Sequence, residues 1–126
     1  MQLVNIEIYK KLESILGKGD VPVYPGIADV DSKFPYVVYR NDSYTADRSK
    51  DGIESYNLSY TIEIVAGKFN KVDELSDLVR VGLDGYRSGL ITRCWNTGGS
   101  YQAGDDFHMQ SLNFEIECDG SGADGR

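Results

Sequence analysis

Residues that could carry out acid–base or nucleophilic chemistry lie close together near the C-terminal end of the chain. His108, the only histidine, follows Asp105 and Asp106, and Ser100 and Ser111 flank this group. A hydrolytic site needs a nucleophile, a base and an orienting carboxylate that meet in space. No nucleophile-elbow pattern surrounds either serine. We therefore expect these residues to be ordinary surface and the protein to have no catalytic activity.

Metal and cofactor motifs are equally weak. Asp47, Asp51 and Glu54 could contact a calcium ion, but the spacing of an EF-hand loop is absent. No glycine-rich phosphate-binding pattern follows a predicted strand. Cys94 and Cys118 lack a CxxC or CxxxH partner, so we expect two buried thiols. The sequence predicts no metal and no cofactor.

The length and the net charge of the chain limit the classes of protein to which it can belong. The chain has 126 residues, a net charge of −7 and a pI of about 4.6. One domain is expected at this length. The acidic balance argues against a free-standing nucleic-acid binder, although an acidic ring lumen would let DNA slide through. No apolar run long enough for a membrane span and no signal peptide are found, so we expect a protein made and kept in a cytoplasm.

The hydrophobic pattern predicts two helices and five strands. We predict helices over 3–16 and 70–84, and strands over 21–24, 36–42, 56–66, 89–97 and 107–118. The polar segment 43–55 is interpreted as a long hairpin tip, and 98–106 as a flexible turn. The order α-β-β-β-α-β-β predicts an α+β two-layer sandwich, with both helices on one face of a mainly antiparallel sheet. We expect one domain over 1–118 and a disordered tail over 119–126.

Individual side chains refine this prediction. Alternation places Tyr56, Leu58, Tyr60, Ile62 and Ile64 on the buried face of one strand. In the last strand the same pattern selects Leu112, Phe114, Ile116 and Cys118. The second helix is expected to begin at an Asn70 N-cap and to bury Val72, Leu75, Leu78, Val79 and Leu83. The first helix is expected to bury Leu3, Val4, Ile8, Leu12, Ile15 and Leu16.

One stretch carries a specific resemblance. Residues 23–26 read VYPG and residues 34–39 read FPYVVY, after an N-terminal helix. The alternating YNLSYTIEIVA, the helical GKFNKVDELSDLVRVGLDG and the final MQSLNFEIE follow in that order. This arrangement, over roughly residues 3–118, resembles the tail-completion or tail-terminator family of long-tailed bacteriophages and prophages. The prolines alone indicate a strand-to-strand corner, because Pro35 biases Phe34 to extended geometry.

The resemblance implies a structural virion protein, made in the cytoplasm of a bacterial host. Members of that family form rings, commonly six-fold, that cap the tail tube and meet the head-completion proteins, while DNA passes through the lumen without specific binding. On this basis we predict a subunit or tube interface on the 43–55 hairpin and a second contact near 97–106. The predicted interface residues are Tyr44, Arg48, Lys50, Asp51, Ile53, Arg93 and Tyr101. The alternatives are another head–tail connector, neck or tail-like interaction module and, third, a small enzyme or ligand-binding domain.

Overall fold

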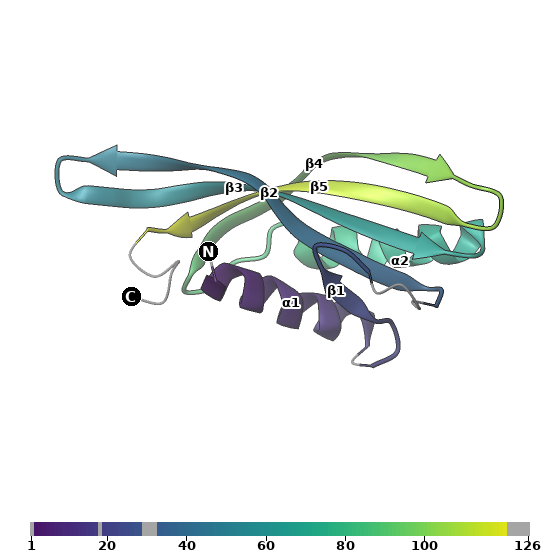
Figure 1. The fold of residues 1–126 in the computed structure, drawn as a ribbon. Coiled ribbons are helices and arrows are strands. Elements are labelled where there is room, and N and C mark those ends of the chain that lie inside the picture. Colours follow the sequence, from purple (N-terminus) through teal and green to yellow (C-terminus); the bar gives the residue numbers. More distant parts are fainter. Residues whose placement is uncertain (1, 18, 29–32, 121–126) are drawn as a thin grey trace.

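A computed structural model describes residues 2–17, 19–28 and 33–120, which form one twisted sheet with two helices beneath it (Figure 1). The elements are α1 (Gln2–Leu16), β1 (Val23–Pro25), β2 (Tyr36–Ser49), β3 (Gly52–Ala66), α2 (Phe69–Leu83), β4 (Ile91–Ala103) and β5 (His108–Asp119). The sheet order is β1-β2-β3-β5-β4. Only the β1–β2 pair is parallel among the described strands. The predicted α+β class and the predicted element order are confirmed.

The segment that contains VYPG and FPYVVY forms a parallel pair of strands, β1 and β2, at one edge of the sheet. Val23 pairs with Val37 and Pro25 pairs with Tyr39. The amide of Gly26 donates to the carbonyl of Tyr39 at 2.8 Å, which extends the pairing past the strand end. β1 covers only three residues of β2. The rest of β2 therefore has no neighbouring strand on its outer side within the described chain.

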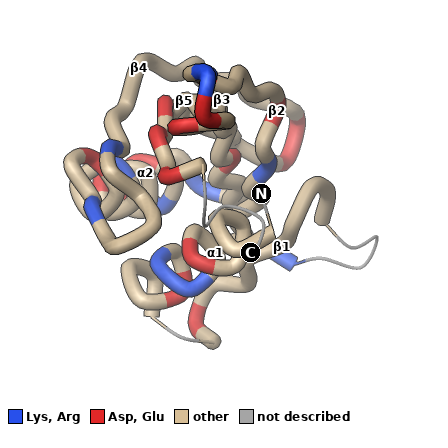
Figure 2. The backbone as a smooth tube through the Cα atoms, turned by 90° about the vertical axis from the view of Figure 1, so that its left-hand side faces the viewer, with Lys and Arg blue, Asp and Glu red and all other residues tan. Residues whose placement is uncertain are grey.

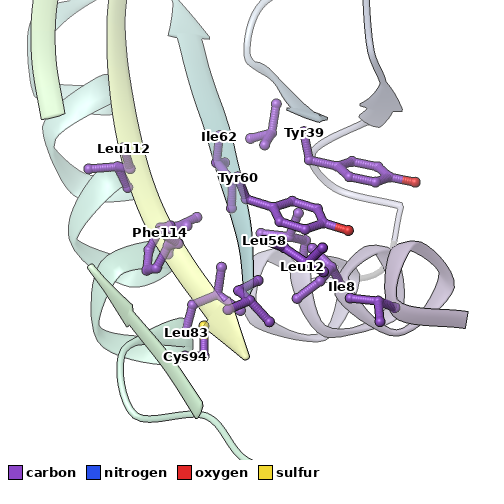
Figure 3. Close-up of a cluster of buried hydrophobic side chains, with 14 of the residues drawn as sticks. Ile8, Leu12, Tyr39, Leu58, Tyr60, Ile62, Leu83, Cys94, Leu112 and Phe114 are labelled. Atoms are coloured by element: carbon purple, nitrogen blue, oxygen red, sulfur yellow. The ribbon is translucent and has the colours of Figure 1, made fainter. Parts of the chain in front are cut away.

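The core lies between the sheet and the helices (Figure 3). The side chains of Tyr39 and Tyr60 extend from the strands toward Ile8 and Leu12 of α1 (Figure 3). Tyr60 is 1% exposed, and its hydroxyl donates a hydrogen bond to Asn5 of α1. A buried tyrosine needs such a partner, because an unpaired hydroxyl in an apolar core is destabilising.

The alternation predicted for the two central strands is confirmed. The β3 and β5 residues assigned to the apolar face are all buried, with exposed fractions of 9% or less. Tyr60 pairs with Phe114 and Leu58 pairs with Ile116, so these residues meet across the strands on the helix side. Cys94 and Cys118 are also buried, as expected.

Three helix predictions are wrong in detail. Leu78 is 45% exposed, and Ser76 takes its place in the buried stripe of α2. Leu3 is 40% exposed on α1, because the buried side of this helix begins at Val4 and continues at every fourth residue after it. α2 begins at Phe69 after an Lys68 N-cap that makes no side-chain hydrogen bond, so Asn70 lies inside the helix.

Two segments predicted as irregular are largely strand. β2 continues to Ser49 and β3 begins at Gly52, so the polar 43–55 segment is a paired ladder with a tip of only two residues. β4 likewise continues to Ala103 through the segment predicted as a turn. Of the predicted tail, Asp119 ends β5 and the amide of Gly120 donates to the carbonyl of Glu54. Residues 121–126 lie outside the described chain.

Two bulges interrupt the β2–β3 ladder. The register shifts between Asn41 and Ser43, and again between Asp47 and Arg48. At the first shift, one extra residue of β2 is accommodated, and the direction of the following side chains is reset. Before the shift, the odd-numbered Tyr39 and Asn41 lie on the helix side of the sheet. After the shift, the even-numbered Tyr44 lies on that side, opposite Leu58.

Burial of the core thiol has a consequence at alkaline pH. Burial, with a smaller contribution from Asp84, raises the pKa of Cys94 to about 12. Burial also raises the pKa of Tyr60. Above the unfolded thiol pKa the unfolded chain loses a proton that the folded chain keeps, so the folded state loses stability as the pH rises toward the folded pKa.

We predict that Cys94→Ala reduces this alkaline loss of stability. Between about pH 8 and about pH 10.5, the fall in the free energy of unfolding should be about 2 kcal/mol smaller than in the native chain. Urea unfolding at the two pH values measures it. Val79→Ala is the control, because it also removes buried apolar atoms but no titrating group. Equal falls in all three proteins would show that the thiol does not contribute.

Candidate assembly interface

The β2–β3 hairpin is the most prominent projection of the molecule. Its outer half extends beyond both helices, so no helix covers it (Figure 1). Ser49 pairs with Gly52, and Lys50 and Asp51 form the loop between them. Gly52 has a φ of 122°, a backbone conformation that other residues rarely adopt. The tight loop therefore presents its side chains at the end of a narrow two-stranded arm.

The end of the arm carries basic charge. Arg48 and Lys50 form no ion pair with any residue in the described part of the chain. Behind them, the Asp47 carboxylate accepts hydrogen bonds from Ser55 and Asn57, each at 3.3 Å. Figure 2 views the molecule from this end, where a basic segment lies beside acidic ones. We call Arg48, Lys50 and Asp51 the hairpin tip.

The arm also carries apolar side chains on its helix side. Tyr44 is 58% exposed, and its ring lies edge-on to Tyr56 with 5.8 Å between centroids. Ile53 is half-buried against the edge of the core. The structure thus brings together five of the predicted interface residues along one arm, from Tyr44 to Ile53.

The other two predicted interface residues lie elsewhere, on β4. The Arg93 guanidinium stacks over the Trp95 ring at 4.3 Å from its centroid. Tyr101 is 46% exposed and packs edge-on against Phe69 of α2. Its hydroxyl contacts Nδ1 of His108, and the two rings are stacked. His108 therefore lies within an aromatic cluster that joins the β4–β5 hairpin to the start of α2.

Most of the sheet face opposite the helices is polar and cross-linked by hydrogen bonds. We call it the open sheet face. Ser59 donates to Glu115 at 2.8 Å, and Thr92 donates to Glu117 at 2.9 Å. These bonds join neighbouring strands through side chains, so most carboxylates on this face already accept a bond from their own chain.

One arginine on the open sheet face is neutralised locally. Arg40 binds Glu63 and donates to Asp42 at 2.9 Å. The hydrogen bond to Glu63 raises the pKa of Arg40 further. Asp42 in turn accepts a bond from Thr61. The face consequently presents small hydroxyl and amide groups with excess negative charge.

An apolar hollow of about 580 Å³ lies at one end of the open sheet face. Phe34, Val38, Val65, Phe107 and Met109 contribute to its walls, and Arg40 and Glu63 border it. Sequence reasoning did not identify it, because its walls come from four separate segments. Among the described residues no group of three or more histidine, cysteine or acidic side chains could hold a metal ion. In the same part of the chain, no helix has the length and hydrophobicity needed to cross a membrane.

The fold itself has solved relatives. A chain from the virion of a native gene transfer agent (GTA) particle superimposes with a TM-score of 0.71 and 16% sequence identity. The match covers 90% of this chain and 92% of that one. The chain is similar in fold to a virion protein. A second solved chain matches with a TM-score of 0.63 and 14% identity, over 91% of this chain and 94% of that one.

Sequence comparison adds no family name. No family model matches the chain, and no curated protein matches it. At identities this low the structural matches show a shared fold and do not by themselves assign a function.

A polar cleft between α2 and the β4–β5 hairpin was also missed. It encloses about 360 Å³ and is lined by Asp73, Ser76, Asp77, Arg80 and Asn96, with parts of Gly98, Gly99, Gln110 and Leu112. We call it the α2–β4 cleft. The signal in the sequence was Ser76, a serine at a buried position of an otherwise apolar helix stripe.

The floor of this cleft depends on one glycine. A Cβ at Gly99 would lie 2.4 Å from the carbonyl oxygen of Ser111 on the paired strand, which is too close for any side chain. We predict that Gly99→Ala lowers the free energy of unfolding by about 1–3 kcal/mol, because the strands must separate. Gly98→Ala is the matched control, since its Cβ would meet no atom within 4 Å. Thermal unfolding of both variants tests this, and similar losses would contradict it.

Proposed function

We propose that this protein caps the tail tube of a phage or phage-like particle and joins the tube to the head-completion proteins, acting as a ring without catalysis. The observation that carries the proposal is the fold match to a chain of the GTA virion, which spans nearly the whole length of both chains. The order of motifs in the sequence, which resembles tail-completion proteins, supports the same conclusion independently.

The shape suits a ring subunit. A ring requires one patch of each copy to meet a different patch of the next copy. The β2–β3 arm projects from one end of the molecule, and the β4–β5 hairpin lies at the other (Figure 1). Tyr44, Ile53 and the hairpin tip offer apolar and basic contacts on the projecting arm. We infer that this arm contacts the neighbouring subunit or the tube.

The open sheet face suits a channel for DNA. Its Glu115 and Glu117 side chains would repel phosphates, as would the negative charge that remains where Arg40 is shared between Glu63 and Asp42. Nucleic-acid binders instead present unneutralised lysines and arginines that release counterions from the phosphates. We propose that this face borders the lumen, so DNA passes without specific binding.

A second candidate function is another connector or neck protein of the same particle. The same projecting arm and fold match support it, since the match relates the chain to the GTA virion as a whole and not to one position in the particle. The partner would then be a head-side ring rather than the tail tube.

Electron microscopy of the purified protein mixed with tail tubes from the same genetic element tests the proposal. Mass photometry of the protein alone gives its oligomeric state, which can be monomeric if the tube acts as a template. Rings at one end of the tubes support tail capping. A protein that does not bind tubes but binds head-completion rings contradicts tail capping and supports the connector function.

A further inference from the structure

We propose that the hairpin tip of one copy binds the α2–β4 cleft of the next copy, with Arg48 or Lys50 entering the cleft. This inference rests on the proposed function, because it names the subunit contact that closes the ring. It goes further by assigning the acceptor surface, which neither the sequence nor the fold match identifies.

The α2–β4 cleft contains an unsatisfied buried group. Ser76 is 7% exposed, and its hydroxyl has no hydrogen-bond partner in the described part of the chain. A buried hydroxyl without a partner costs about 1–3 kcal/mol. A partner side chain that brings a donor into the cleft would remove this cost, because a hydroxyl oxygen has two acceptor lone pairs.

The cleft also carries unneutralised negative charge. Asp73 accepts no side-chain hydrogen bond from any described residue, and Asp77 is bound only by Arg80, at 3.3 Å. A lysine ammonium has three donors and an arginine guanidinium has five. Either group could bind Asp73 and reach the Ser76 hydroxyl.

The tip supplies the complementary charge. Arg48 and Lys50 have no ion pair of their own in the described chain, and the two-residue loop makes the tip narrow. Figure 1 places the tip and α2 toward opposite ends of the molecule, so a tip cannot reach its own cleft but can reach that of a neighbour. Such a head-to-tail contact repeats from copy to copy and forms a ring when the rotation between copies closes.

The open sheet face is the competing acceptor, because it holds more carboxylates. Those of Glu63, Glu115 and Glu117 already accept bonds from Arg40, Ser59 and Thr92 of their own chain. A tip cation there would share each carboxylate with the donor that it already holds. Asp73 accepts no side-chain hydrogen bond from a described residue, and the cleft also contains the unpartnered Ser76 hydroxyl, so the cleft is the better acceptor.

Disulfide trapping tests the contact without altering the charges of the cleft. Asp51→Cys is mixed with Gly98→Cys, which leaves Arg48, Lys50, Asp73, Asp77 and Arg80 in place, and the mixture is mildly oxidised with and without tail tubes. Gly98 lines the cleft, and a Cβ there would meet no atom within 4 Å. The native thiols are buried, so they should not compete. The mixed dimer should be several-fold more abundant than with Ser14→Cys on the exposed side of α1. Asp73→Lys in the Gly98→Cys chain should reduce it.

The outcomes separate the inference from the proposed function. Equal cross-linking to Gly98→Cys and Ser14→Cys overturns the inference, and so does preferred cross-linking to Ser59→Cys on the open sheet face. In either case rings on tubes would still support tail capping. A specific cross-link to Gly98→Cys without any capping of tubes supports the tip-to-cleft contact and contradicts the tail-capping function.

Discussion

Phe114→Ala is expected to lower the free energy of unfolding by about 3–5 kcal/mol, which is the usual cost of deleting a buried aromatic ring. Phe114 is 1% exposed on β5, opposite Tyr60 and Asn96, and faces the helices from the middle of the sheet. Phe114 belongs to the buried cluster that includes residues of both helices, so the cavity cannot be closed by moving one loop. Urea unfolding followed by circular dichroism measures the loss.

The matched control is Phe69→Ala, the same change at a half-exposed site. Phe69 is 52% exposed and contacts Tyr101 and His108 through ring edges. Such aromatic pairs contribute about 0.5–1.5 kcal/mol, so the expected loss is about 1 kcal/mol. If the two variants lost equal stability, the core would not be centred on β3 and β5 as described.

Reversing the charge of the hairpin tip should prevent assembly while leaving the subunit folded. In Arg48→Glu/Lys50→Glu, acidic side chains would approach an acidic acceptor. Like charges and lost pairs at an interface cost about 2 kcal/mol or more, roughly a 30-fold loss of affinity. The fraction of tubes with capped ends, counted by electron microscopy, measures this. Both residues belong to the end of the β2–β3 arm, which extends beyond the helices, so thermal unfolding should change little (Figure 1).

The control for the tip is a double reversal elsewhere with the same change in net charge. Lys10→Glu/Lys68→Glu alters exposed positions on α1 and at the start of α2. Tubes should be capped normally by this variant. Loss of capping in both variants would indicate general electrostatic repulsion between subunits, and normal capping in both would remove the hairpin tip from the interface.

The sequence predicted the parts of the fold in which burial follows a simple period. The alternation of β3 from Tyr56 to Ile64 and of β5 from Leu112 to Cys118 is visible because one face meets the helices and the other meets solvent. The outer halves of β2 and β4 were missed for the same reason. Residues 43–49 and 98–103 carry few apolar side chains on either face, so their pairing comes mainly from backbone hydrogen bonds that leave no clear hydrophobic pattern.

The candidate site was predicted in part. The resemblance to tail-completion proteins pointed to the 43–55 hairpin, and its basic residues lie at the tip. The α2–β4 cleft brings together Asp73 and Ser76 of α2 and Asn96 of β4, a separate element further along the chain. No local pattern predicts such a meeting, because it depends on how α2 lies across the β4–β5 hairpin.

The first bulge of the β2–β3 arm also limits how the arm can change in length. Beyond Asn41/Ser43, Tyr44 and Ala46 occupy the helix side only because one extra residue was inserted before them. A single deletion or insertion at the base of the arm would exchange the two sides of that strand, since side chains alternate with a period of two. We therefore expect homologous chains whose arms differ there by an odd number of residues to gain or lose a bulge.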